Sequence, residues 1–250
     1  MSKMQTVCID ATWDKEIILG DSFISYLKEH NIKSVALFAS VQFLELDTVK
    51  KQITDMGITI KQTKAKRTHV TGQILGCDAY HDSFGEDIIQ TTDLSVYIGD
   101  GMFHPKALLL AQMRSKTIKP VLIWNPVTEK IQIIDKKDII QQIKKLRVNI
   151  MKFLSADTIG LLVTVKPGQQ YLKNALKLKE KWEKDGKSCY IFIDDDLSIQ
   201  LLENYPFIDV WVNTACPRIG TDDITTIEVP LVNIRDVHDP IKTLDELYKE

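Results

Sequence analysis

The stretch Ile208-Asp209-Val210-Trp211-Val212-Asn213-Thr214-Ala215-Cys216-Pro217-Arg218 does most to predict how this chain folds. Its apolar half has the character of a buried strand, and Pro217 ends that strand because proline cannot donate to a sheet's hydrogen-bond ladder. Open α/β sheets bind their ligands at the carboxyl ends of strands, which is where this pattern delivers Cys216. We therefore interpret Cys216 as a ligand or a nucleophile rather than as core filler.

Outward from this stretch, the chain alternates between short apolar runs and segments with helical periodicity. Strands are expected over residues 4–9, 34–39, 58–60, 94–98, 121–124, 130–134, 161–165, 189–193 and 208–212. Helices are expected over residues 21–31, 41–56, 104–113, 136–154, 171–182 and 197–202. Such alternation predicts an α/β fold of two similar units with parallel sheets flanked by helices. We place the units at residues 1–135 and 136–250.

Composition sets the broad class. The chain has 250 residues, of which 44% are hydrophobic and 26% charged, as in a soluble globular protein. With a net charge of −2, the chain lacks the excess of positive charge that would indicate direct nucleic-acid binding. No apolar run is long enough to span a membrane, and the first residues lack a signal-peptide core, which predicts a cytoplasmic protein. Four cysteines in a reducing compartment are expected to be thiols or metal ligands rather than disulfides.

The cysteines fall into two groups. Cys8 and Cys189 lie inside predicted strands, where we interpret them as small buried hydrophobes. Cys77 lies in a glycine-flanked loop and resembles Cys216 in that respect. A lone loop cysteine is a weak signal of metal binding, so both functional and structural interpretations stay open. Cys77, His81 and the upstream His69 permit a zinc site, although their spacing matches no standard zinc motif.

Two turns are further candidates. The Gly99-Asp100-Gly101 turn precedes a helix that opens at His104-Pro105, and such a turn can bind an anion through its backbone amides. It can equally be an ordinary strand-to-helix turn, and the Lys166-Pro167-Gly168-Gln169 turn has the same two interpretations. The basic stretch of residues 61–67 is either a solvated face or a site for an acidic partner.

Four motifs together resemble the archaeal-type diphthamide synthesis enzymes, the 2-(3-amino-3-carboxypropyl)histidine synthase family. In chain order they are GQILGCDA (72–79), GDGMFHPKAL (99–108), VKPGQ (165–169) and TACPRIGTDD (214–223). The resemblance implies three similar α/β domains, each of which gives one cysteine to a [4Fe-4S] cluster. It also implies that the free iron binds S-adenosylmethionine. Reductive cleavage would then yield a 3-amino-3-carboxypropyl radical that attacks a histidine of translation elongation factor 2.

For this chain the resemblance implies cluster ligation by Cys77 and Cys216. The residues expected to line the cofactor pocket are Gly101, His104, Gln169 and Asp222. Only the family's second and third domains are matched, so the first domain and its cysteine would lie before residue 1. Cys8 does not correspond to that missing ligand, although it or another chain could substitute for it.

The expected partners are elongation factor 2 and either a separate first-domain-like protein or a second copy of the chain. The alternatives are a homologue that has lost the radical chemistry, a non-catalytic scaffold or binding subunit of the same pathway, and an unrelated two-cysteine metalloprotein such as a zinc-dependent hydrolase.

Two spatial expectations follow. Cys77 and Cys216 should lie close together if they share a cluster. The segment of residues 4–13, with Trp13 as its cleanest probe, should begin an apolar face through which the chain self-associates or binds a first-domain-like protein.

Overall fold

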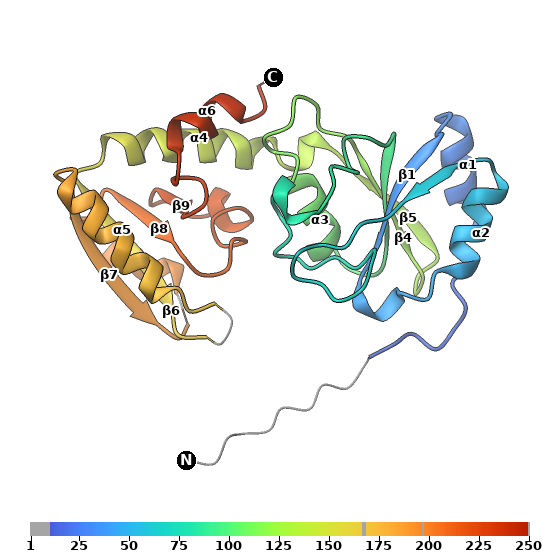
Figure 1. Ribbon diagram of the computed structural model, residues 1–250, viewed down its shortest axis with the longest axis horizontal. Coiled ribbons are helices and arrows are strands. Elements are labelled where there is room, and N and C mark those ends of the chain that lie inside the picture. The colour runs from blue at the N-terminus through green and yellow to red at the C-terminus, as the bar shows by residue number, and fades with distance from the viewer. Residues whose placement is uncertain (1–10, 167–168, 197, 250) are drawn as a thin grey trace, which may run out of the picture. The chain divides into compact units, whose positions relative to one another are not determined.

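The computed structural model describes residues 11–166, 169–196 and 198–249 in two compact α/β units (Figure 1). The first unit contains residues 11–111 and 119–135, and the second contains residues 112–118 and 136–249. Segment 112–118 belongs with the second unit because Arg114 forms an ion pair of 2.8 Å with the buried Asp236. Next to it, the Met113 carbonyl accepts a hydrogen bond from the Tyr248 N–H.

The first unit is built on a five-stranded sheet of order β2-β1-β3-β4-β5. Its strands are β1 Ser34–Ala39, β2 Thr59–Lys61, β3 Leu94–Ile98, β4 Val121–Asn125 and β5 Lys130–Ile134. Its helices are α1 Asp21–Glu29, α2 Asp47–Asp55 and α3 Phe103–Leu110, with 3-10 turns at Val41–Phe43 and His81–Ser83. Strands β1 to β4 are parallel, as expected, but β5 runs antiparallel to β4. The four residues between β4 and β5 are too few for a parallel crossover, so the chain must reverse there.

The second unit is built on a parallel four-stranded sheet of order β7-β6-β8-β9. Its strands are β6 Thr158–Thr164, β7 Ser188–Asp194, β8 Val210–Asn213 and β9 Leu231–Asn233. Its helices are α4 Ile140–Ser155, α5 Leu172–Lys184 and α6 Pro240–Glu246, with 3-10 turns at Lys136–Asp138, Ile199–Asn204 and Asp223–Thr225. The strand order is that of β2-β1-β3-β4 in the first unit, so the expectation of two similar units is confirmed.

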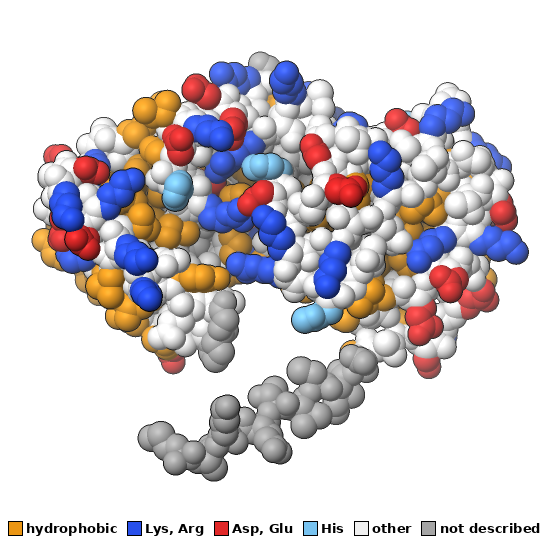
Figure 2. Space-filling model, in the orientation of Figure 1, with side chains coloured by type: hydrophobic (Ala, Val, Ile, Leu, Met, Phe, Trp, Pro, Cys, Tyr) orange, Lys and Arg blue, Asp and Glu red, His pale blue; other side chains and the backbone are white. Residues whose placement is uncertain are grey.

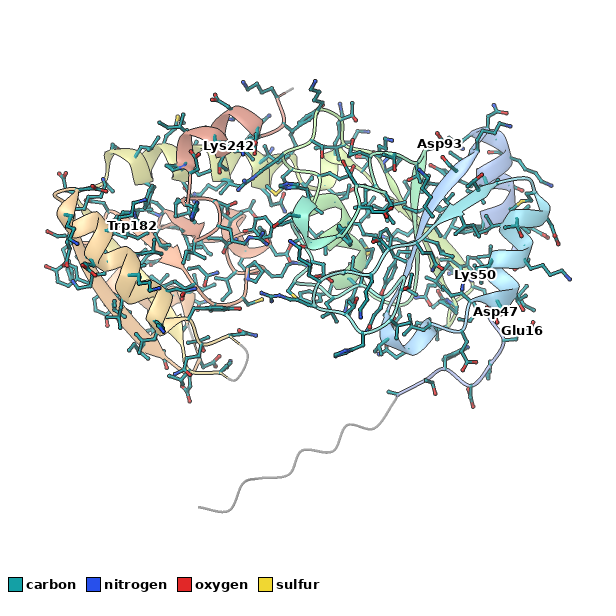
Figure 3. The ribbon with its side chains drawn as sticks, in the orientation of Figure 1. Glu16, Asp47, Lys50, Asp93, Trp182 and Lys242 are labelled. Carbon is teal, nitrogen blue, oxygen red and sulfur yellow. The ribbon has the colours of Figure 1, made fainter. Side chains whose placement is uncertain are left out.

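The two units also share a device at the amino ends of their strands. In the first unit, Asp93 Oδ2 accepts hydrogen bonds from the N–H groups of Lys33 and Ser34 at 2.9 and 2.8 Å (Figure 3). In the second, Asp209 Oδ2 accepts from two consecutive N–H groups at the start of β6, at 3.0 and 2.8 Å. Each aspartate precedes the third strand and binds the start of the first. The bond from the Lys33 N–H is the main cause that lowers the pKa of Asp93.

The cores explain why the central strands read as continuous apolar runs. Strand β3 is buried along its whole length, as parallel strands covered on both faces are. In the second unit, Trp211 on β8 is fully buried against Gly160 on β6, where a Cβ would lie 2.5 Å from the indole ring. Phe153 and Trp182 fix α4 against α5 through an edge-on ring contact of 5.2 Å (Figure 3). Glycine at position 160 therefore makes room for the largest side chain of this core.

Several expected helices differ in detail. The single helix predicted over 41–56 is a 3-10 turn at Val41–Phe43 followed by α2, because the tight turn after β1 directs Phe43 into the core. The N-cap of α1 is Gly20, and Asp21 is the first helical residue rather than the cap. In α5, Ala175 and Trp182 are buried, whereas Leu176 is 52% exposed.

Strand β9 and helix α6 were missed because both are short: β9 has three residues and follows Pro230, and α6 begins at Pro240. The expected strand over residues 4–9, with Cys8, lies outside the described residues. Trp13, expected in an exposed apolar face, is half-buried against Phe43 at a ring distance of 5.4 Å, and its N–H donates to the Gln42 carbonyl. In the described part of the chain, no helix has the length and apolar character needed to cross a membrane.

Candidate functional site

The Cys77 loop is attached to the carboxyl end of β1. The Ala39 N–H donates to the Gly72 carbonyl at 2.9 Å, and the Ala39 carbonyl accepts from the Ile74 N–H at 3.1 Å. These two bonds form a parallel bridge that joins the loop to the end of β1. Gly72 has a φ of 82°, a conformation open mainly to glycine. Cys77 is thus carried at the carboxyl edge of the first sheet, where it is half-exposed.

The buried Asp78 holds this loop from inside. Its carboxylate accepts a hydrogen bond of 2.9 Å from the Leu75 N–H, and its own N–H donates to the Leu75 carbonyl at 3.0 Å. Burial raises the pKa of Asp78, against the opposing effects of the Leu75 N–H and of Arg67. Cys77 therefore lies inside a turn from Leu75 to Asp78 that is closed twice, once through the Asp78 side chain and once through the backbone.

The Cys77 loop meets the start of α3. A Cβ built on Gly76 would lie 1.9 Å from the Phe103 ring, so glycine is what lets the two segments approach. His104 is edge-on to Phe103 and stacks on Tyr97 at a ring distance of 6.5 Å and an angle of 11°. The structure thus brings two of the sequence motifs together within the first unit, GQILGCDA and GDGMFHPKAL. The turn before α3 needs Gly101, whose φ is 64°.

Two buried hydroxyl groups lie at the same edge and were missed from the sequence. Ser40 follows β1, and the Tyr97 hydroxyl reaches the backbone at Gly99, where a Cβ would lie 2.5 Å from it. Desolvation raises the pKa of Tyr97 to about 12, and the nearby Ser40 hydroxyl partly offsets this rise. Among the described residues, neither oxygen has a partner at hydrogen-bonding distance. The available signal for Tyr97 was a side chain with a hydroxyl group inside a strand that is buried throughout.

In the second unit, Asn213 clamps the turn that carries Cys216. This buried asparagine ends β8; its Nδ2 donates to the Cys216 carbonyl at 2.8 Å, and its Oδ1 accepts from the Ala215 N–H at 3.0 Å. The same Nδ2 donates to Asn233 Oδ1 at 2.7 Å. Asn233 ends β9, and its amide donates to the Pro217 carbonyl at 2.8 Å. Two paired amides, each at the end of a strand, thus hold the half-exposed Cys216 from both sides.

The missed asparagines had a sequence signal. Both β8 and β9 end in Val-Asn, and an asparagine directly after an apolar run is typical of a residue that binds the following turn. Gly220 lies over this pair, because a Cβ there would be 2.3 Å from Asn233 Oδ1.

Asp222 serves the same turn. Its Oδ2 accepts a hydrogen bond of 2.6 Å from Nε of Arg218, a buried residue, and forms an ion pair with Nη2 of the same side chain. The structure therefore gives Asp222 a role in fixing the turn after Cys216. Its predicted contact with a cofactor stays a prediction.

Gln169 follows β6, which is adjacent to β8. Its N–H donates to the Lys166 carbonyl at 3.1 Å, and Lys166 forms an exposed ion pair of 3.2 Å with Asp196. The Leu162 carbonyl of β6 accepts from both the N–H and the hydroxyl of Thr214, at 3.0 and 2.7 Å. The turns that carry Gln169 and Cys216 therefore lie at one edge of the second sheet. Residues 167–168 of the Lys166 turn lie outside the described residues.

The two cysteines lie in different units, so their proximity stays a prediction. They are not equivalent in topology, because Cys216 directly follows β8 whereas Cys77 lies in the long connection between β2 and β3. The zinc site considered for Cys77, His81 and His69 is not formed, since no three His, Cys, Asp or Glu side chains gather at metal-binding distance anywhere in the described ranges. The buried role predicted for Cys189 is confirmed: it is 3% exposed, and desolvation raises its pKa.

Comparison with known proteins decides the family. The model of the diphthamide synthesis protein family matches residues 6–238. The chain belongs to this family. Members similar to it include the 2-(3-amino-3-carboxypropyl)histidine synthase of Pyrococcus horikoshii, 27% identical over 86% of this chain and 58% of that protein. Another is subunit 1 of the Schizosaccharomyces pombe synthase, 27% identical over 84% of this chain and 48% of that subunit.

The fold agrees with solved members of the family. Dph2 from Pyrococcus horikoshii with a 4Fe-4S cluster has a TM-score of 0.64 at 24% identity, over 89% of this chain and 62% of that one. A second structure of the same protein has a TM-score of 0.67 at 22% identity, over 94% of this chain and 64% of that one. This diphthamide synthesis family member thus spans about half to two thirds of the length of the relatives it matches.

Proposed function

We propose that this chain is part of a [4Fe-4S], S-adenosylmethionine-dependent transferase that attaches a 3-amino-3-carboxypropyl group to a histidine of translation elongation factor 2. Cys77 and Cys216 are two of its cluster ligands. Membership of the diphthamide synthesis family carries this proposal, together with the position of each cysteine in a braced turn at the carboxyl edge of a sheet.

The donor set fits an iron-sulfur cluster. Soft thiolates suit iron-sulfur chemistry, and Cys77 and Cys216 are the half-exposed thiols among the three described cysteines. Cys189 is 3% exposed inside β7 and is therefore the least accessible of the three thiols to an incoming cluster. When bound, such a cluster supplies electrons and an open iron position for S-adenosylmethionine. The chain's own contribution is to hold the two sulfurs in turns that do not need to reorganise.

The supporting residues have defined roles in this proposal. Asn213 and Arg218 fix the backbone on either side of Cys216, and Asp78 does the same for Cys77. Gly101 and His104, at the start of α3 beside the Cys77 loop, would line the cofactor pocket with Gln169 and Asp222. Gly101 permits close approach of a ligand to the backbone, because no atom lies within 4 Å of where its Cβ would be.

Anaerobic reconstitution with iron and sulfide tests this proposal. We expect a brown protein with thiolate-to-iron absorption that is lost in Cys77→Ala and in Cys216→Ala and retained in Cys189→Ala. If the wild-type chain needs a partner protein to hold iron, that partner should bear one loop cysteine and restore the absorption.

Two results would contradict the proposal. Stoichiometric, tight binding of zinc alone would identify a different metalloprotein. Failure to bind iron with or without a cysteine-bearing partner would instead favour the non-catalytic binding subunit of the same pathway.

A further inference from the structure

Two buried hydroxyl groups in the first unit have no role in the proposed cluster site. Tyr97 on β3 is fully buried, and Ser40, directly after β1, is 2% exposed. Within the described ranges neither hydroxyl has a hydrogen-bond partner. A bond between the two would still leave one O–H without an acceptor, because two hydroxyl groups bring two donors. Phenylalanine at position 97 would fill the same space without that cost, so a buried hydroxyl there needs an explanation.

Both groups lie where an open α/β sheet binds its ligand. The strand order β2-β1-β3-β4 reverses between β1 and β3, because the chain leaves β1 for β2 on one side and leaves β3 for β4 on the other. Ligands of such sheets bind at the carboxyl ends of the two strands that flank the reversal. The Ser40 N–H donates to the Ile98 carbonyl at 3.3 Å, which places Ser40 at the carboxyl ends of both strands.

The Tyr97 side chain leans toward the same edge. Tyr97 is paired in register with Phe38, and Ser40 lies two residues after Phe38, so Ser40 and Tyr97 belong to one face of the sheet. A Cβ on Gly99, two residues further along the chain, would lie 2.5 Å from the Tyr97 hydroxyl. The two hydroxyl groups therefore converge on the crevice at the carboxyl ends of β1 and β3.

The surroundings of this crevice favour a ligand with a carboxylate. Burial raises the pKa of Tyr97 to about 12, so its hydroxyl is protonated at neutral pH and can donate a hydrogen bond. Helix α3 begins nearby at Phe103, and the amino end of a helix attracts negative charge. No atom lies within 4 Å of where a Cβ on Gly101 would be, which leaves room for a ligand against this turn. An acceptor with two negatively charged oxygens therefore suits the crevice.

A charged side chain in the same turn narrows the class of ligand. Asp100 is exposed, and its negative charge contributes to the raised pKa of Tyr97. This carboxylate would repel a simple anion but would attract a ligand that also carries an ammonium group. An α-amino acid group carries both charges on one carbon. Basic and acidic side chains are interspersed on the face drawn in Figure 2, so on that face surface charge alone does not select a site for such a ligand.

We propose that this crevice binds an α-amino acid group, with its carboxylate on the Ser40 and Tyr97 hydroxyls at the start of α3 and its ammonium on Asp100. In the proposed function, on which this assignment rests, that group is the amino acid end of S-adenosylmethionine, which carries the transferred 3-amino-3-carboxypropyl group. The first unit then holds that end, and Ser40 and Tyr97 select it. A free amino acid offers the same chemistry and is the second possible source of the group.

Ligands with and without the amino acid group test this assignment on the full chain without its cluster. S-adenosylhomocysteine carries the group, whereas 5′-methylthioadenosine is a similar nucleoside thioether that lacks it. In titration calorimetry, we expect Tyr97→Phe to raise the dissociation constant of S-adenosylhomocysteine by about tenfold to a hundredfold, because a hydrogen bond to a charged group is lost. The dissociation constant of 5′-methylthioadenosine should not change. Ser40→Ala should give the same pattern.

Ser95 supplies the matched control. Its hydroxyl is also fully buried and without a partner among the described residues, but it lies two residues before Tyr97, toward the amino end of β3. Ser95→Ala should therefore leave both dissociation constants unchanged. Thermal unfolding without ligand separates binding from structure, because removal of a hydroxyl that has no protein partner should not lower the midpoint of Tyr97→Phe. Asp100→Asn should weaken S-adenosylhomocysteine but not its analogue that lacks the amino group.

L-methionine distinguishes the two sources. If Tyr97→Phe also weakens the binding of L-methionine, the crevice takes a free amino acid as well; if only S-adenosylhomocysteine binds, it takes the cofactor alone. A wild-type chain that binds neither ligand overturns the assignment. It is also overturned if Tyr97→Phe weakens 5′-methylthioadenosine as much as S-adenosylhomocysteine, or lowers the midpoint of unfolding without ligand.

Iron binding keeps this test apart from that of the proposed function. Tyr97→Phe should retain the thiolate-to-iron absorption after reconstitution, because it leaves Cys77 and Cys216 in place. A chain that binds iron but no amino acid group contradicts only the assignment of the crevice. A chain that binds the amino acid group but no iron, with or without a cysteine-bearing partner, contradicts only the proposed function.

Discussion

Replacing Asn213 with alanine removes the amide that clamps the Cys216 turn. Three hydrogen bonds are lost, to the Cys216 carbonyl, the Ala215 N–H and the Asn233 side chain, with lengths of 2.7 to 3.0 Å. Asn213 is 1% exposed, so water cannot replace these bonds without opening the turn. At about 0.5–1.5 kcal/mol for each bond, we expect a loss of about 2–4 kcal/mol in the free energy of unfolding of the second unit. That is a large share of the stability of a typical domain.

Two variants sharpen this prediction. Asn213→Asp keeps the acceptor for the Ala215 N–H but places a carboxylate oxygen against the Cys216 carbonyl. Its free energy of unfolding should therefore fall by at least as much as that of Asn213→Ala. Asn125→Ala is the matched control in the first unit, because Asn125 also ends a strand and accepts from two following N–H groups, at 2.9 and 3.2 Å. Its bonds lie in an exposed turn, and we expect a loss of about 1 kcal/mol or less.

Urea unfolding followed by hydrogen exchange measures the effect. Hydrogen exchange must be measured for individual peptides, because a chain of two units can unfold in two steps. A single unfolding transition would not show which unit had lost stability. In Asn213→Ala, amide protection should fall in β8 and β9 and stay unchanged in β1 and β3. Alkylation of Cys216 should accelerate, and alkylation of Cys77 should not. A loss below about 0.5 kcal/mol, or one no larger than that of Asn125→Ala, would refute the reasoning.

Three further predictions follow from single contacts. The pKa of Asp93 is lowered by its backbone bonds, so the stabilisation that its carboxylate gives is present at neutral pH and disappears as the pH falls through its folded-state pKa. Asp93→Asn should therefore lower the midpoint of thermal unfolding at pH 7 and leave it nearly unchanged at pH 2. Gly160→Ala should destabilise the second unit by about 1–3 kcal/mol in urea unfolding, because the new Cβ would lie 2.5 Å from the buried Trp211 ring. An unchanged unfolding midpoint would show that this core rearranges to accommodate the added methyl group. Under native conditions iodoacetamide should modify Cys77 and Cys216 before Cys189, whose pKa is raised by burial, and mass spectrometry of the digested protein would detect the reverse order.

The sequence alone determined the α/β class and several of its strands. The strands predicted at 34–39, 94–98 and 130–134 have those bounds in the structure. The first two are buried runs between turn residues, and such runs cannot be extended into the turns. The burial of Cys189 followed in the same way from its place in a strand. The family was recognisable because its motifs place glycine and proline at fixed positions beside the cysteines, such as Gly76 before Cys77 and Pro217 after Cys216.

Tertiary structure alone decided which turns are braced and by what. The pairing of Asn213 with Asn233 joins the ends of two adjacent strands twenty residues apart, and local periodicity carries no signal for that contact. The same holds for Gly76, which reads as an ordinary loop glycine until Phe103 is found against it. Helix starts and the transfer of segment 112–118 to the second unit likewise could not be predicted from local sequence patterns. The antiparallel direction of β5, in contrast, follows from the short connection that precedes it. Local sequence determines which segments can form strands or helices. Contacts between distant segments determine where each strand or helix ends and which side chains it buries. The physical reason is that burial and tertiary hydrogen bonds form only when distant segments pack against each other.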